Sequence, residues 1–124
     1  MSFPKELKYN KNHTWVKKEN GNCKLGIIKY SVDKADQIVF INLPEEGKEL
    51  NIGDVYVSVE SVKWSGHLES PVKGKVVKVN EELFDEPEMI NEDPYTSWIA
   101  EVEVEEYGSL MDSEQAKKEY EGGK

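Results

Sequence analysis

The sequence predicts a mostly β protein, an antiparallel sandwich or flattened barrel with few, short helices. Two observations point to this class. β-Branched residues occur in short runs through the first hundred positions, and these runs are bounded by clusters of Gly, Pro, Asn and Asp. The regular spacing of the runs is typical of antiparallel strands joined by turns.

Length and composition predict one domain, residues 1–124. With 124 residues, of which 37% are hydrophobic, the chain can build one compact core and is too short for two ordinary domains. No run approaches the roughly 18 to 20 consecutive apolar residues that a membrane-spanning helix needs, and residues 1–5 lack a signal-peptide core. We therefore expect a cytoplasmic protein that does not enter a membrane.

The charge balance argues against nucleic-acid partners. Twenty-five acidic residues against 16 basic ones give a formal charge of −9, which repels phosphate backbones and anionic membrane surfaces. The single cysteine, Cys23, cannot form an internal disulfide, and with only His13 and His67 beside it there is no zinc pattern. We expect no bound metal and a packing role for Cys23.

Strands are predicted wherever a β-branched run lies between turn residues. Asn20-Gly21-Asn22, between the first two runs, is typical of a hairpin turn. The predicted strands are Thr14–Lys18, Cys23–Ile28, Gln37–Asn42, Val55–Val62, Lys75–Asn80 and Trp98–Val104.

The last predicted strand alternates most clearly. One set of positions is apolar and the intervening set is mostly acidic, so one face is expected to pack and the other to face water. The apolar set is Trp98, Ala100, Val102 and Val104, and the other set is Ile99, Glu101, Glu103 and Glu105.

Two short helices are predicted. Asp112 and Gln115 have the spacing of a capping box, which predicts a terminal helix over roughly residues 112–121. A turn of helix is also expected at Tyr30–Asp36.

The segment from Val55 to Val72 runs from a strand through a polar turn and back toward a strand, with Lys63 at or next to the tip. A lysine in that position holds its amine away from the sheet on a flexible stem, while the hairpin offers a defined backbone to a modifying enzyme. These are the requirements of an attachment site for a swinging arm.

The residues around Lys63 resemble the modification hairpin of the glycine cleavage H proteins. The resemblance extends from about residue 8 to the terminal helix in the family's order and spacing. It rests on Glu60-Ser61-Val62-Lys63, Ser70-Pro71-Val72-x-Gly74, His13-x-Trp15-Val16, Leu25-Gly26-Ile27, Ile38-Val39-Phe40-x-x-Leu43-Pro44-Glu45-x-Gly47, Val77-x-x-Asn80, Ile90-Asn91-Glu92-Asp93-Pro94-Tyr95 and Trp98.

The resemblance implies a lipoyl/biotinyl-type β-sandwich, or hammerhead barrel, with lipoic acid amide-linked to Lys63. Lipoamide is a cyclic disulfide that opens to a dithiol, so it can accept a group or electrons at one partner and release them at another. A carrier, not an enzyme, is then expected. Biotin is the competing arm, but the biotin carriers known to us flank their lysine with methionines, whereas Val62 and Trp64 flank Lys63.

The implied partners are those of glycine cleavage. They are glycine decarboxylase, which loads an aminomethyl group, an aminomethyltransferase, which removes it, dihydrolipoyl dehydrogenase, which reoxidises the arm, and a lipoate ligase or lipoyltransferase, which attaches it. Glu60 is either a charged contact for the enzyme that attaches the lipoyl group or only a solvated carboxylate on a surface strand.

Three positions around the expected arm depart from the family's pattern. Thr14 and His67 stand where H proteins typically have acidic residues, thought to hold the cationic nitrogen of the loaded arm, and Trp64 stands where they usually have Ala. A carboxylate near a cation in a partly dry cleft contributes roughly 1 to 3 kcal/mol. We therefore expect a rebuilt cleft beside Lys63, formed by Thr14, Trp64 and His67 together with His13, for which a supporting position held by hydrogen bonds is favoured.

These departures leave two alternatives open beside glycine cleavage. The chain could be an H-like lipoate-binding protein that carries sulfur intermediates for a heterodisulfide-reductase-like complex. It could also be a relay that passes lipoyl groups to other proteins and holds no metabolic cargo.

Overall fold

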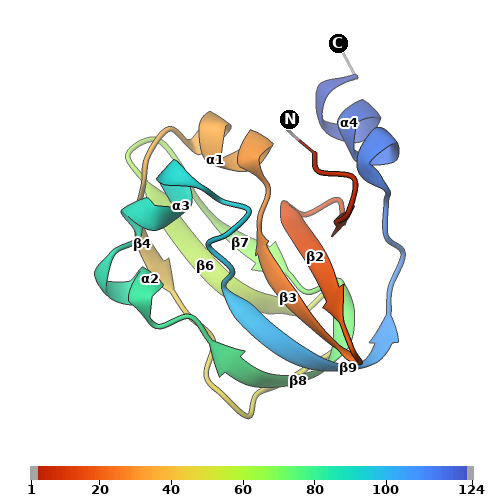
Figure 1. Ribbon diagram of the computed structural model, residues 1–124. Coiled ribbons are helices and arrows are strands. Elements are labelled where there is room, and N and C mark those ends of the chain that lie inside the picture. Colours follow the sequence, from red (N-terminus) through yellow and green to blue (C-terminus); the bar gives the residue numbers. More distant parts are fainter. Residues whose placement is uncertain (1–2, 123–124) are drawn as a thin grey trace.

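The computed structural model describes residues 3–122, so residues 1, 2, 123 and 124 of the expected domain 1–124 lie outside the described residues. Strands dominate it (Figure 1). In chain order the elements are β1 (Lys8–Tyr9), β2 (Thr14–Glu19), β3 (Asn22–Ile27), α1 (Lys29–Ala35), β4 (Ile38–Asn42), β5 (Glu49–Leu50), β6 (Val55–Ser61), β7 (Ser65–Glu69), β8 (Val72–Val79), α2 (Glu82–Asp85), α3 (Glu88–Glu92), β9 (Ala100–Tyr107) and α4 (Ser113–Glu121).

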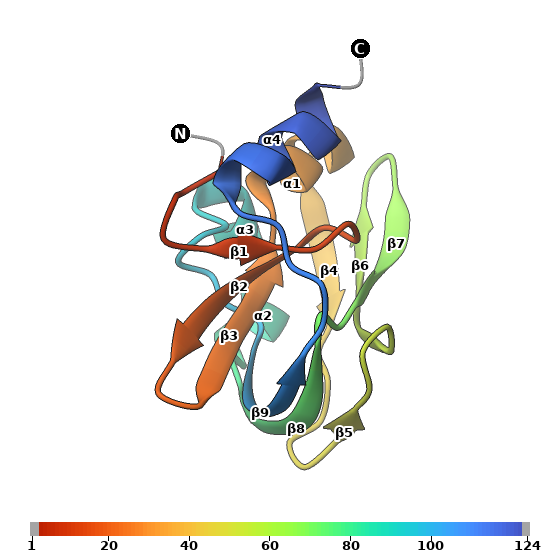
Figure 2. The same ribbon diagram turned by 90° about the vertical axis from the view of Figure 1, so that its right-hand side faces the viewer.

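The strands form two antiparallel sheets. The larger has six strands in the order β1-β2-β3-β9-β8-β5, and the smaller has three in the order β4-β6-β7. The second view shows the smaller sheet, with the β6–β7 hairpin at its outer side, beside the larger one (Figure 2). The predicted mostly β sandwich with short helices is confirmed.

All six predicted strands are present, with ends that agree or differ by at most three residues. The segment after Lys63 returns as β7, as its composition suggested. The two-residue strands β1 and β5 and the short helices α2 and α3 were not predicted, because each is too short to show a periodic pattern.

The alternation in the last strand is correct from Ala100 onward and wrong before it. Ile99 is fully buried although it was expected on the acidic face, and Ala100 beside it is also fully buried. Trp98, expected on the packed face of the strand, is partly buried against a second cluster, and the Lys24 ammonium lies 5.1 Å from its ring. The period-2 pattern fails here because β9 begins only at Ala100, so Trp98 and Ile99 precede the regular strand.

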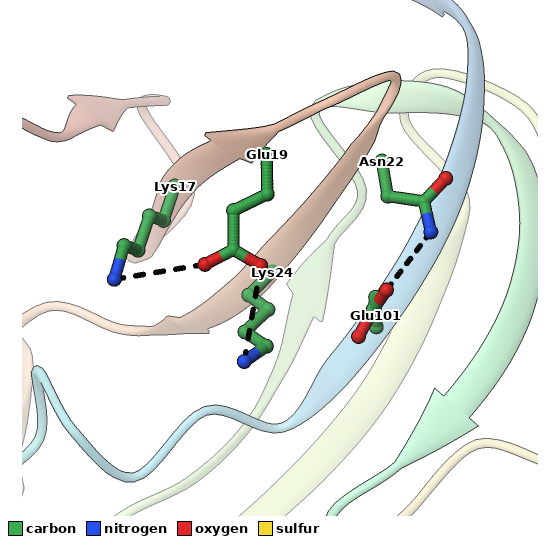
Figure 3. A network of polar contacts seen from close by, with 5 residues as sticks. All are labelled: Lys17, Glu19, Asn22, Lys24 and Glu101. Atoms are coloured by element: carbon green, nitrogen blue, oxygen red, sulfur yellow. Dashed lines mark hydrogen bonds and ion pairs between the residues drawn. The ribbon is translucent and has the colours of Figure 1, made fainter.

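The predicted turn between β2 and β3 is confirmed. Asn20 and Gly21 both have positive φ, 46° and 86°, the conformation required by a two-residue hairpin with the twist of the strands. Glu19 lies 3.6 Å from the Lys17 ammonium and 3.8 Å from that of Lys24. Figure 3 shows this exposed network on the six-stranded sheet, so it belongs to the sheet that does not carry Lys63.

The main core lies between the two sheets and includes Leu25, Ile41, Val59, Leu68 and Val102. Cys23 is fully buried there, and burial raises the pKa of its thiol to about 12, which fits a packing role. Within residues 3–122 no helix is long and apolar enough to cross a membrane.

A second cluster lies under the terminal helix, which the sequence placed correctly. In α4 the Asp112 side chain accepts from the Gln115 backbone N–H at 2.8 Å, and the Gln115 side chain accepts from the Asp112 N–H at 3.0 Å. The expected capping box is therefore formed. Ala116 is buried in this cluster together with Phe3, Tyr9 and Trp15, and the cluster attaches α4 to the six-stranded sheet.

Candidate functional site

The turn between β6 and β7 is closed by hydrogen bonds between Ser61 and Trp64. The Ser61 backbone N–H donates to the Trp64 carbonyl at 2.7 Å, and the Ser61 hydroxyl donates to the same oxygen at 2.8 Å. The Trp64 N–H donates to the Ser61 hydroxyl at 2.8 Å. Residues 62 and 63 are thereby held as a short, fixed loop at the tip of the hairpin, which both views show projecting from the body of the molecule (Figures 1 and 2).

Lys63 lies in this loop with its amine open to solvent. Its side chain is 71% exposed, and its Nζ lies 3.9 Å from a carboxylate oxygen of Asp36, whose side chain is 55% exposed. An ion pair at that distance between two exposed groups is weak, so it does not shield the amine from an approaching reagent. The sequence-based placement of Lys63 agrees with the structure.

Asp36 was not foreseen as part of the site. It is the C-cap of α1 and has φ of 74° and ψ of −99°, a left-handed conformation that favours glycine. The sequence offered one signal, the end of a predicted turn of helix at Asp36. Only the fold shows that the end of this helix meets the hairpin tip.

Beside the hairpin tip, His13 and Trp64 line a small cavity of about 90 Å³. Tyr30, Ser31, Lys34 and Ala35 of α1 form the rest of its lining, and Trp64 also packs against the main core. The His13 and Trp64 rings meet edge to face with centroids 5.8 Å apart. Two of the expected cleft residues are thus brought together, and α1 contributes the four lining residues that the sequence did not suggest.

Gly66 is what allows the Trp64 ring to lie against the hairpin. A Cβ at Gly66 would collide with the indole, because the ring covers the glycine directly. The bulky residue beside Lys63 is therefore folded back along β7 and does not project from the tip.

His13 is held in place by its backbone as well as its ring. It has φ of 67°, its N–H donates to the Tyr120 hydroxyl at 2.9 Å, and its Nδ1 shares a hydrogen bond of 2.7 Å with the Ser31 hydroxyl. Burial lowers the pKa of the imidazole, since the charged form is poorly solvated there. His13 is therefore a neutral, fixed wall of the cavity.

The other three expected site residues lie elsewhere. Thr14 is fully buried, and its hydroxyl shares a hydrogen bond of 2.9 Å with that of Tyr56, so it does not open into the cavity. Glu60 and His67 are exposed on the outer face of the three-stranded sheet. The cleft predicted from four residues is thus formed by His13 and Trp64 with α1.

At the tip of the hairpin, the group available for chemistry is the exposed primary amine of Lys63. Among residues 3–122 no group of three His, Cys, Asp or Glu side chains is placed to hold a metal ion. A fixed loop that presents a solvent-exposed lysine fits a covalent amide-linked group, because acylation needs access to Nζ and a backbone that an enzyme can recognise.

Comparison with known proteins gives a consistent result. Residues 7–122 match the family model described as glycine cleavage H-protein. The glycine cleavage system H protein of Staphylococcus epidermidis is 47% identical over 111 residues, which cover 89% of this chain and 88% of that protein. That of Staphylococcus haemolyticus is 48% identical over 113 residues, 90% of each.

A solved structure agrees with the sequence matches. The crystal structure of a glycine cleavage system H protein from Mycobacterium marinum superposes with a TM-score of 0.87 at 29% sequence identity, covering 93% of this chain and 96% of that one.

Proposed function

Because this chain belongs to the glycine cleavage H-protein family, whose members carry lipoate on a lysine, we propose that Lys63 is the lipoylated residue and that the arm carries an aminomethyl group. The observation that carries the proposal is the exposed Lys63 amine in a turn closed by Ser61 and Trp64. The proposed partners are glycine decarboxylase, an aminomethyltransferase, dihydrolipoyl dehydrogenase and the enzyme that attaches the lipoyl group.

The proposed role of this chain is to hold the lipoyl arm where its partner enzymes can reach it. When bound, the lipoyl group supplies a dithiolane that opens to a dithiol and can accept and release a group or electrons. Lys63 supplies the flexible stem, and the Ser61–Trp64 hydrogen bonds fix the loop from which that stem departs. Acylation makes Nζ a neutral amide, so Asp36 loses its charged neighbour and its carboxylate is left beside the base of the arm.

The cavity beside the tip is mostly apolar. Trp64 and the neutral His13, whose rings meet edge to face, form part of its lining, and Lys34 contributes a positive charge. The carboxylate nearest to the acceptor amine among the described residues is Asp36, which stands outside this lining. The acidic group beside the base of the arm is therefore the residue that caps the end of α1, and it is not at position 14 or 67.

The sulfur-carrier alternative is not favoured. The relatives and the solved structure described above are all glycine cleavage H proteins. We retain glycine cleavage as the proposed pathway, and the relay alternative is likewise not favoured.

The attachment proposal is tested by intact mass. The full-length protein is incubated with a lipoate ligase, lipoate and ATP, and we expect one added lipoyl group. Lys63→Arg keeps the charge and removes the acceptor, so its mass stays unchanged. Lys34→Arg is the matched control, because Lys34 borders the same cavity, and it is expected to gain the full lipoyl mass.

Two results would contradict the proposal. One is an unmodified wild-type protein under conditions where the ligase modifies another carrier. The other is modification that persists in Lys63→Arg. The cargo is then tested separately by adding glycine and glycine decarboxylase to the lipoylated protein, where an aminomethyl adduct is expected by mass.

A further inference from the structure

A bulge in β4 turns two consecutive apolar side chains toward solvent. In the pairing of β4 with β6, Ile38 lies opposite Ser61 and Phe40 lies opposite Glu60, so Val39 is an extra residue with no partner of its own. Val39 is 52% exposed and Phe40 is 39% exposed. A bulge breaks the ladder locally and redirects side chains, and such features are common next to functional sites.

A second aromatic residue joins them from another element. Phe84 of α2 is 59% exposed, and its ring meets that of Phe40 edge to face with centroids 6.2 Å apart. Figure 1 shows α2 directly beside β4. We call Val39, Phe40 and Phe84 the Phe40 surface. Neighbouring exposed aromatic side chains are characteristic of protein-binding sites, whereas scattered single ones are not.

The Phe40 surface is close to the acceptor lysine. Phe40 is the cross-strand neighbour of Glu60, which lies three residues before Lys63 in the same strand and turn. At about 3.3 Å per residue, the base of Lys63 is roughly 10 Å farther along the hairpin. A protein that touches Lys63 and is of ordinary size therefore also reaches the Phe40 surface.

The border of the Phe40 surface is strongly acidic. All seven charged residues between positions 81 and 93 are Asp or Glu. Phe84 shares a surface depression with four acidic residues, Glu45, Glu46, Glu81 and Asp85. An apolar centre with a negative border is complementary to a partner face with an apolar centre and lysines or arginines around it.

We propose that the Phe40 surface is the docking site for the enzyme that acylates Lys63, and that this enzyme meets it with an apolar patch bordered by basic residues. The inference rests on the proposed lipoylation of Lys63. The attaching enzyme must bring its active site to Nζ itself and so must cover the surface next to the hairpin. Partners that act later meet an arm that extends well beyond Nζ and are freer in where they bind.

The test measures the steady-state kinetics of lipoylation with the unmodified full-length protein as the varied substrate. We expect Phe84→Ser to raise the KM of the lipoylating enzyme for this protein by about tenfold, and Val39→Ser to raise it by several-fold. The kcat should be unchanged, because these substitutions weaken docking and leave Lys63 and its loop as they are. The KM of the wild type should also rise with salt concentration.

The chain offers a matched control. Val77 is also an unpaired residue at a bulge, between Val76 and Lys78 of β8, and is 40% exposed, but it lies on the six-stranded sheet. Val77→Ser makes the same chemical change as Val39→Ser and should leave KM within about twofold of the wild type. Thermal unfolding of each variant shows that it is folded at the assay temperature.

Three outcomes would overturn the proposal. In the first, Lys63 is lipoylated and the Phe40-surface variants keep the wild-type KM. In the second, Val77→Ser raises KM as much as Val39→Ser does. In the third, the wild type dimerises in light scattering and Phe84→Ser makes it monomeric, which would assign the surface to a second copy of this chain. Each leaves lipoylation at Lys63 standing, whereas absence of modification in the wild type contradicts the proposed function itself.

Discussion

Asp36 brings a carboxylate to Lys63 in a backbone conformation that few residues other than glycine adopt. Its φ of 74° and ψ of −99° place the Cβ against the backbone, and its oxygen lies 3.9 Å from the Lys63 Nζ. An exposed ion pair at this distance does not offset such strain. We therefore expect that Asp36 is tolerated for its charge at the base of the arm and not for stability.

Replacing Asp36 by glycine is expected to stabilise the protein. Relief of the left-handed strain, partly offset by glycine's greater freedom in the unfolded chain, should raise the free energy of unfolding by about 1 kcal/mol. Chemical denaturation measures it. Asp36→Asn removes only the charge and should change stability by less than about 0.5 kcal/mol. A loss of stability in Asp36→Gly would show that the carboxylate holds the turn.

His13 makes stability depend on pH. Burial lowers the pKa of the folded imidazole below its usual 6.5, so the unfolded chain binds the proton more readily. The stabilisation that His13 gives the folded protein is therefore fully present above about pH 6.5, and it is lost as the pH falls toward the pKa of the folded imidazole.

We expect urea unfolding to show a fall in stability as pH drops below about 6.5, and His13→Asn to flatten this part of the profile. Asparagine tolerates positive φ and is therefore suited to this position. His67→Asn is the control, since it makes the same chemical change at an exposed histidine outside the His13 contacts described above. An identical slope in wild type and His13→Asn would assign the pH dependence to other groups.

At the scale of single residues, the sequence placed Lys63 at the tip of the hairpin but did not reveal its surroundings. Lys63 could be placed because strand and turn residues on either side put it at a tip. Thr14 was assigned to the cleft, yet its side chain points inward to Tyr56. The direction of a side chain next to an irregular start of a strand depends on packing, which the local pattern does not contain.

At the scale of elements, the β6–β7 hairpin has a tip closed by hydrogen bonds and one side covered by the Trp64 ring. The Trp64 ring lies over Gly66, and the fit leaves no room for a Cβ. The aromatic ring thereby closes the side of the hairpin that faces His13 and α1.

Gly66→Ala is expected to displace the Trp64 ring and to lower the free energy of unfolding by about 1 to 3 kcal/mol, as overpacking does. Urea unfolding measures the loss, and indole fluorescence should shift to the red as Trp64 becomes more exposed. The control is a double-mutant cycle with Trp64→Ala, in which the cost of Gly66→Ala should largely disappear. An equal cost in both backgrounds would mean that the glycine is needed for the backbone and not for the ring.

The elements that could be predicted are those that carry their own pattern. The β2–β3 hairpin has its Asn-Gly turn, and α4 has its capping box, so both were found with ends correct to one residue. α2 and α3 have four and five residues and lack side-chain caps, and β1 and β5 have two residues each. Such elements exist because neighbours in space hold them, and a single sequence does not reveal those neighbours.

At the scale of the whole molecule, the site is assembled from segments far apart in the chain. The cavity takes His13 from the loop before β2, four residues from α1 and Trp64 from the hairpin. The sequence predicted the fold class because alternation is local. It could not predict that α1 would meet the hairpin, since this depends on how one sheet lies against the other.

The hydroxyl of Tyr120 joins the two ends of the described chain. It accepts from the His13 N–H and donates to the carbonyl of Asn10 at 2.7 Å, from a helix that begins a hundred residues later. On the ribosome this tyrosine emerges after both sheets are available to form. A protein whose synthesis stops before residue 120, or whose final helix is removed by proteolysis, would keep both sheets and lose these hydrogen bonds to the loop that carries His13. The defect would appear first on the side of the molecule that carries Lys63.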